Sequence, residues 1–96
     1  MKKAEAVARI ENGEVRATEW RFAPGAETGW HRHEYDYVVV PLTDGALRIV
    51  DAAGESVVEL KLGVAYFRKA GVEHNVTNAS GRYLAFVDIE LVEHPG

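Results

Sequence analysis

The sequence predicts an all-β domain, a sandwich or barrel of about eight short strands. Short runs rich in β-branched and aromatic residues are separated at fairly regular intervals by Gly, Asp, Asn and Pro. No segment keeps apolar residues at the three- and four-residue spacing that an amphipathic helix requires. The 96 residues show no internal repeat, linker or change of composition, so we expect one domain over residues 1–96.

The first half of the chain contains the clearest strand signals. Residues 15–22 alternate between the two faces of a strand, and Pro24–Gly25 ends this run as a turn. Residues 35–42 form the most strand-like stretch. Asp44–Gly45 follows it as a strong hairpin signal, which makes residues 46–50 the return strand.

The second half continues the same pattern. Further strands are expected at residues 56–62, 64–68, 73–77 and 83–91. The two ends, residues 1–6 and 92–96, are expected to be frayed or used in packing between subunits. Four aromatic residues are expected in the core: Trp20, Phe22, Phe67 and Phe86.

Composition narrows the class of protein. The formal net charge of −4 argues against nucleic acid as a partner, because phosphates require a basic face. No apolar run has the length of a membrane span, and no apolar stretch follows the N-terminal lysines as a secretory signal would. The chain has no cysteine, which removes disulfides and thiolate ligands. We therefore expect a cytoplasmic protein with no membrane and no nucleic-acid partner.

Three of the four histidines have the spacing of metal ligands. His31 and His33 are two residues apart, so on a strand both imidazoles project from the same face. His74 follows a turn at Gly71 and adds a third imidazole, unless it is a half-buried histidine that donates a hydrogen bond to a carbonyl. His94 lies after the last expected strand and is expected to be solvated.

These residues resemble the two sequence motifs of the cupin superfamily. The first motif is Gly, five residues, His-x-His, three or four residues, Glu, six residues, Gly; its positions fall at Gly25, His31, His33, Val38 and Gly45. The second is Gly, five residues, Pro-x-Gly, two residues, His, three residues, Asn; its positions fall at Gly63, Lys69, Gly71, His74 and Asn78. Eight of the ten positions agree, with valine at the Glu position and lysine at the Pro position.

The resemblance implies a fold, a cofactor and a mode of assembly. The fold would be a double-stranded β-helix, or jelly-roll barrel, of two antiparallel sheets. A divalent transition metal (Fe, Zn, Ni or Mn) would lie between the sheets, held by His31, His33 and His74. A homodimer is expected through an outer sheet face, and three aromatic residues are candidates for that face: Trp30, Tyr35 and Tyr83.

The motif residues other than histidine are expected to shape the fold. The four motif glycines lie where tight turns would need a positive φ: Gly25, Gly45, Gly63 and Gly71. Asn78 is expected to hold a turn together through its side-chain amide.

The valine at the Glu position leaves the fourth ligand open. If Val38 occupies that position, its side chain should point into the barrel beside the metal. Waters could complete the shell, as in the three-histidine iron cupins that cleave carbon–carbon bonds with dioxygen. Asp36, two residues earlier on the same strand, could instead replace the missing carboxylate as a metal ligand, or Tyr37 could approach if the loop is one residue shorter.

A site of three neutral histidines leaves the metal dicationic, which favours a small anionic or chelating ligand. Four residues near the expected pocket are candidates to point inward: Tyr66, Arg68, Phe86 and Asp88. Arg21 and Arg48 could pair with an anion, or else be ordinary surface charges. No catalytic residue is assigned. Three functions are therefore open: a metal-dependent small-molecule enzyme of the oxygenase type, a non-catalytic binding or sensing module, or a protein with a structural metal.

Overall fold

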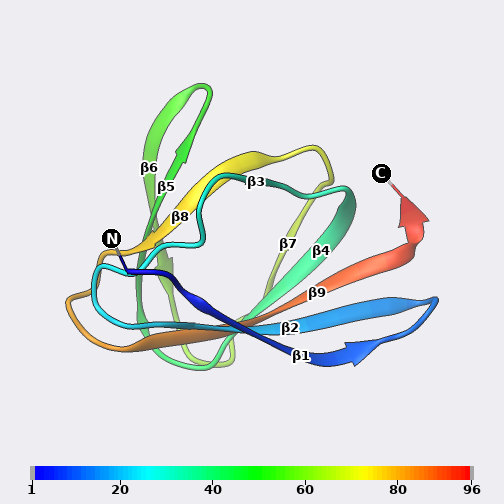
Figure 1. The fold of residues 1–96 in the computed structure, drawn as a ribbon, viewed down its shortest axis with the longest axis horizontal. Coiled ribbons are helices and arrows are strands. Elements are labelled where there is room, and N and C mark those ends of the chain that lie inside the picture. Colours follow the sequence, from blue (N-terminus) through cyan, green and yellow to red (C-terminus); the bar gives the residue numbers. More distant parts are fainter. Residues whose placement is uncertain (1, 96) are drawn as a thin grey trace.

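The strands of this computed structural model form two antiparallel sheets that face each other (Figure 1). The structure describes residues 2–95, and side chains as far as residue 93. In this range the strands are β1 (Glu5–Glu11), β2 (Val15–Phe22), β3 (His31–Arg32), β4 (Tyr35–Pro41), β5 (Gly45–Asp51), β6 (Gly54–Leu60), β7 (Tyr66–Arg68), β8 (Glu73–Asn78) and β9 (Leu84–Pro95). The described residues include no helix long and apolar enough to cross a bilayer.

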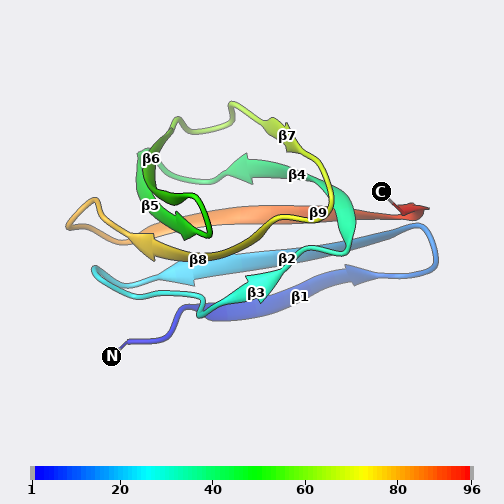
Figure 2. The same ribbon diagram turned by 90° about the horizontal axis from the view of Figure 1, so that it is seen from above.

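The chain passes back and forth between the two sheets. One sheet has the order β1-β2-β9-β4-β7 and the other has the order β3-β8-β5-β6 (Figure 2). Apart from the hairpins β1–β2 and β5–β6, each connection leads from one sheet to the other. This is the double-stranded β-helix, so the predicted fold class is confirmed.

Three segments differ from the expected strands. Residues 5–6 and 92–95 are not frayed: the first belong to β1, which pairs with β2, and the second extend β9. The expectation that these residues are frayed was wrong, because both segments gain their strand form from neighbours distant in sequence. Their use in packing between subunits stays a prediction. The two-residue strand β3 was also not expected, since among residues 2–95 it pairs with β8 alone. Residues 1 and 96 lie outside the described range.

The hydrophobic core lies between the sheets. Phe22 and Leu84 are fully buried there, and Trp20 packs against the cluster from its edge. Phe86 belongs to the same cluster, with its ring centroid 5.5 Å from that of Phe22. Phe67 was expected in the core but is 49% exposed, because β7 turns Tyr66 and Arg68 inward and the residue between them outward.

Asn78 and Gly45 show why the motif residues matter to the fold. The buried Asn78 amide donates hydrogen bonds to the carbonyls of Phe22 (3.2 Å) and Arg82 (2.6 Å), as expected of a residue that holds a turn together. Three of the four motif glycines have the expected positive φ. Gly45 does not; a Cβ there would lie 2.5 Å from Leu84 Cδ1, so close packing and not backbone conformation requires the glycine.

Candidate metal centre

The three histidines of the motifs converge at one point of the barrel. His31 on β3 pairs directly with His74 on β8, and His33 follows β3 on the same side. Their ring centroids are 4.7–5.2 Å apart, and one ligand nitrogen from each lies within 4.8 Å of the others. The sheet pairing of β3 with β8 therefore brings together residues that are far apart in sequence.

Hydrogen bonds orient His31 and His33 toward the cluster. His31 Nδ1 lies 2.9 Å from the carbonyl oxygen of Gly29, which we assign as a bond donated by the ring. Its Nε2 is then free of a proton and lies 3.1 Å from Nε2 of His33. The backbone of His33 is held by a bond donated to Val72 O and one accepted from Gly71 N. Both rings thus present a nitrogen to a common centre.

Burial keeps two of these rings neutral. It lowers the pKa of His33 to about 3, with help from the nearby His31 and His74 charges. It likewise lowers the pKa of His74 to about 4, again with a contribution from His31. Neutral imidazole is the form that binds metal, so these rings need lose no proton to do so near neutral pH.

The donor set fits a divalent metal ion. Ligand nitrogens about 2.05 Å from an ion, at angles between octahedral and tetrahedral, lie about 2.9–3.4 Å apart. The observed Nε2–Nε2 distance of 3.1 Å between His31 and His33 falls in that range. Together with His74, these two residues make a three-histidine group that can hold a metal ion.

The structure brings neither Asp36 nor Val38 to the histidines. Tyr37 and Val39 line the cavity, so their neighbours on β4 project to the other side. Asp36 accepts a hydrogen bond from Ala70 N (2.8 Å), and its second oxygen lies 3.6 Å from Lys69 Nζ. The expectation that Val38 points inward was wrong, and Asp36 is bound to Lys69 and Ala70 and not to the histidine group.

Tyr37 takes the inward place next to the cluster. Its ring stacks on that of His33 with centroids 3.9 Å apart and an interplanar angle of 17°. Burial raises the pKa of Tyr37, so its phenol stays neutral. The register of β4 against β9 shifts between Tyr35 and Tyr37, just before this inward residue.

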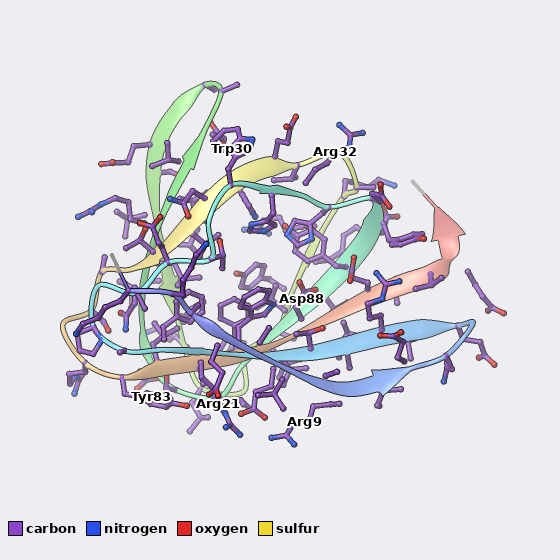
Figure 3. The ribbon with its side chains drawn as sticks, in the orientation of Figure 1. Arg9, Arg21, Trp30, Arg32, Tyr83 and Asp88 are labelled. Carbon is purple, nitrogen blue, oxygen red and sulfur yellow. The ribbon has the colours of Figure 1, made fainter. Side chains whose placement is uncertain are left out.

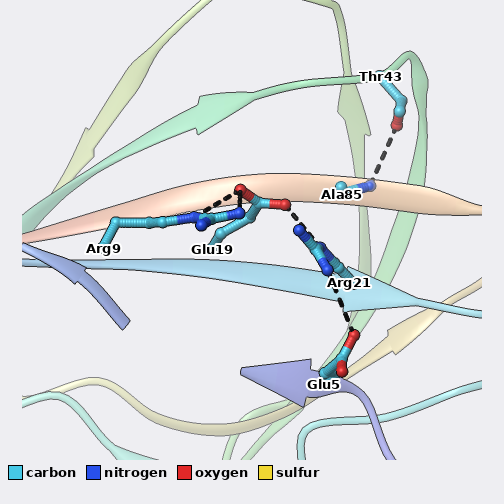
Figure 4. Close-up of polar contacts among 6 residues, drawn as sticks. All are labelled: Glu5, Arg9, Glu19, Arg21, Thr43 and Ala85. Carbon is cyan, nitrogen blue, oxygen red and sulfur yellow. Dashed lines mark hydrogen bonds and ion pairs between the residues drawn. The ribbon is translucent and has the colours of Figure 1, made fainter. Parts of the chain in front are cut away.

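A cavity of about 250 Å³ opens beside the histidines and is lined largely by apolar side chains. All four residues proposed to point inward line it: Tyr66, Arg68, Phe86 and Asp88. Arg21 and Arg48 do not. Arg21 lies on the outer side of the sheet, where Glu19 and Glu5 pair with it (Figure 4), and Arg48 pairs with Glu55 at 3.8 Å. Both are surface charges.

Asp88 is the buried acid of this cavity, and it points between the sheets (Figure 3). Its Oδ2 lies 3.9 Å from His33 Nδ1, and its Oδ1 has no hydrogen-bond partner among the described residues. Burial, and then the nearby Glu90 charge, raise its pKa to about 7. A second hollow of about 260 Å³ shares five lining residues with the first: Trp20, Thr28, His31, His33 and Asp88.

The sequence analysis missed three polar residues that line the cavity, namely Thr28, Asp51 and Ser56. Thr28 lines the cavity, and its hydroxyl oxygen lies 3.2 Å from His31 Nδ1 and donates to Gly29 O. A threonine three residues before the first histidine carries no signal by itself. His94, expected after the last strand, instead belongs to β9, and its side chain lies outside the described part of the chain.

Comparison with known proteins gives one consistent family. The family model described as "Cupin domain" matches residues 18–90. The chain is 60% identical over 83 residues to the beta-alanine degradation protein BauB of Pseudomonas aeruginosa, covering 86% of this chain and 87% of that protein.

Solved structures agree with that match. A cupin domain from Bordetella pertussis is 50% identical and superposes with a TM-score of 0.92 over 94% of each chain. A double-stranded β-helix protein from Klebsiella pneumoniae, 21% identical, shares the fold with a TM-score of 0.78 over 98% of this chain and 81% of that one. With its barrel, its histidine group and these relatives, the chain belongs to the cupin family.

Proposed function

We propose that residues 1–96 act as one cupin domain that binds a divalent transition metal (Fe, Zn, Ni or Mn) and presents it to a small carboxylate metabolite. The observation that carries this proposal is the convergence of His31, His33 and His74 at the cavity. Three neutral imidazoles leave the ion its full charge and open positions, so it would bind an anionic oxygen and polarise the attached carbon.

The proposed activity is a metal-dependent reaction of that metabolite, and the cavity supports it in two ways. Tyr66 and Asp88 line the space where a metal-bound ligand would lie, so either residue could donate a proton to that ligand or accept one from it. Arg68 lies at the rim, where its guanidinium contacts the Tyr66 ring at 4.4 Å. The relative's name places that protein in the breakdown of a small amino acid, which fits a substrate with a carboxylate.

The metal content and its exposure to ligands test this function. Protein purified without a histidine tag should hold about one divalent metal per chain by elemental analysis. After replacement by Co²⁺, addition of propanoate should shift the visible absorption of the ion, because a carboxylate enters an open position. A bound ion whose spectrum ignores every small carboxylate would mean a closed structural site, and this function would be wrong.

The protein is further proposed to act as a homodimer in the cytoplasm, joined through the outer face of the five-stranded sheet. On that face, one apolar residue from each strand pairs with the next across the sheet. We call these five residues the apolar row: Ile10, Ala17, Ile89, Val38 and Phe67. Its two end residues, Ile10 and Phe67, are about half exposed. A second copy related by a twofold axis would cover this row with the same row. Of the aromatic residues expected on an outer face, Trp30 and Tyr83 are exposed and Tyr35 is partly buried.

Val38→Glu tests the dimer. A carboxylate in the middle of the apolar row would be desolvated opposite its own copy, so we expect the dimer dissociation constant to rise about 100-fold or more. Light scattering should then find a monomer, with metal content unchanged because Val38 faces away from the histidines. Val57→Glu, on the exposed side of β6, is the matched control and should remain dimeric. A monomeric parent protein would contradict the proposal.

A further inference from the structure

Asp88 is a buried acid that the metal site does not account for. Its side chain is 9% exposed, and Oδ1 lacks any hydrogen-bond partner within the described residues. The only basic group of that part of the chain found within 4.0 Å is the ring of His33, which burial keeps neutral. A buried carboxylate without a cation is unfavourable and is retained where a function requires it. A bound cationic ligand would supply the positive charge that the described residues do not place beside Asp88.

The surroundings of Asp88 have the chemistry that recognises an ammonium group. Phe86 lies two residues earlier on the same face of β9, and Trp20 on β2 pairs with Phe86. The rings of both, and that of Tyr37, line the same cavity as Asp88. A carboxylate flanked by aromatic faces attracts a desolvated cation by charge and by the ring quadrupoles.

The one guanidinium that lines this cavity among the described residues, that of Arg68, is engaged elsewhere, and Arg16 of the adjoining hollow pairs with Glu90. Arg68 is exposed at the rim, contacts the Tyr66 ring at 4.4 Å, and donates a hydrogen bond to Phe67 O at 2.9 Å. It forms no ion pair with Asp88. Asp88 Oδ1 therefore remains available to accept a hydrogen bond from a ligand.

Asp88 lies close enough to the histidine cluster for one small molecule to reach both. The ring of His33 has Nε2 facing His31 at 3.1 Å and Nδ1 facing Asp88 Oδ2 at 3.9 Å. The metal position and the acid are thus separated by one imidazole ring. A cavity of about 250 Å³ admits a ligand of only a few heavy atoms.

We propose that Asp88 binds the ammonium group of a small aminocarboxylate whose carboxylate binds the metal held by His31, His33 and His74. The ligand class is then a short zwitterion and not a plain carboxylate or a diketone. This inference rests on the metal-dependent function proposed above and names its substrate class.

An isosteric pair of ligands tests the ammonium subsite. 3-Aminopropanoate and butanoate differ only in an ammonium in place of a methyl group. On the Co²⁺-loaded protein, calorimetry should find 3-aminopropanoate binding about tenfold tighter or more, as expected for a charge-assisted hydrogen bond. In Asp88→Asn the two ligands should bind equally. Equal binding to the parent, or a preference that survives in Asp88→Asn, would overturn the inference.

Two controls make the outcome specific. Glu90→Gln changes another carboxylate of β9, one that already pairs with Arg16 at 3.6 Å, and should keep the preference. Asp88→Asn retains the size of the side chain and replaces a buried acid, whose ionised form is disfavoured by burial, with a neutral amide. Its melting temperature should therefore not fall below that of the parent.

The experiments distinguish a failure of the proposed metal function from a failure of the proposed ammonium subsite. If butanoate leaves the Co²⁺ spectrum of the parent unchanged, the proposed metal function is wrong. The ammonium subsite is then decided on metal-free protein, by following n-propylammonium binding through backbone amide shifts in NMR. Binding that is lost in Asp88→Asn supports the subsite, and the same shifts in both proteins overturn it.

Discussion

Replacing His33 by alanine should abolish the stabilisation of this protein by divalent metal. His33 supplies one of the three nitrogens of the cluster and is held from both sides, by its backbone bonds to the Gly71–Val72 turn and by the Tyr37 ring. A metal present at a thousand times its dissociation constant stabilises the folded state by about 4 kcal/mol. In a domain of this size, that corresponds to a rise in melting temperature of about 15–30 °C.

The measurement is the metal-induced shift in melting temperature of each variant, compared with its own metal-free state. This comparison removes the cost of the cavity that His33→Ala leaves beside Tyr37. His33→Gln, which nearly keeps the volume, should lose most of the shift as well. His94→Ala, which changes the histidine of β9, should keep the whole shift. A His33→Ala protein that gains as much from metal as the parent would show that the metal binds elsewhere.

The metal-free protein should lose stability as the pH falls from 6.5 to 4. The lowered pKa values of His33 (about 3) and His74 (about 4) keep both rings neutral in the folded state, whereas both take up a proton when unfolded. Asp88 acts oppositely: its raised pKa, about 7, leaves it protonated when folded and ionised when unfolded. The unfolded state therefore binds a net excess of about one proton, and stability falls by about 1.4 kcal/mol per pH unit.

Asp88→Asn should make this pH dependence steeper. Without Asp88 only the two histidines contribute, so the net excess rises to about two protons and the slope roughly doubles. Urea denaturation of the metal-free parent and of Asp88→Asn, at several pH values between 4 and 6.5, measures both slopes. A flat profile for the parent, or identical slopes for the two proteins, would contradict the assigned protonation states.

Local patterns in the sequence were sufficient for the architecture and for the histidines. Residues 15–22 form β2 with the predicted bounds, because strict alternation and a Pro-Gly turn define that strand locally. The spacing of His31, His33 and His74 was equally informative, since the family motif records which strands meet. β1 and β3 were missed, because each is a strand only by pairing with a neighbour that the local sequence does not reveal.

The direction of single side chains was harder to predict. On β4, Tyr37 lines the cavity and Val38 does not, and the register shift between Tyr35 and Tyr37 is marked by no local pattern. On β9, apolar residues occupy both faces around Asp88, so alternation does not distinguish the cavity side from the outer side. Positions of this kind depend on tertiary register, which a period of two residues cannot supply.

The place of β9 at the centre of the five-stranded sheet has a consequence for how the protein forms during synthesis. Its partners are β2 and β4, so Phe22 pairs with Leu84 and Val15 with Leu91 across most of the chain. Until β9 has left the ribosome, β2 and β4 each have an edge without a partner, and Asp88 is missing from the cavity. Pairings so distant in sequence carry a large loop-closure entropy and fold on the millisecond-to-second scale. The nascent chain thus has exposed β-edges until β9 emerges, which makes the addition of β9 the step most open to capture by chaperones or to aggregation.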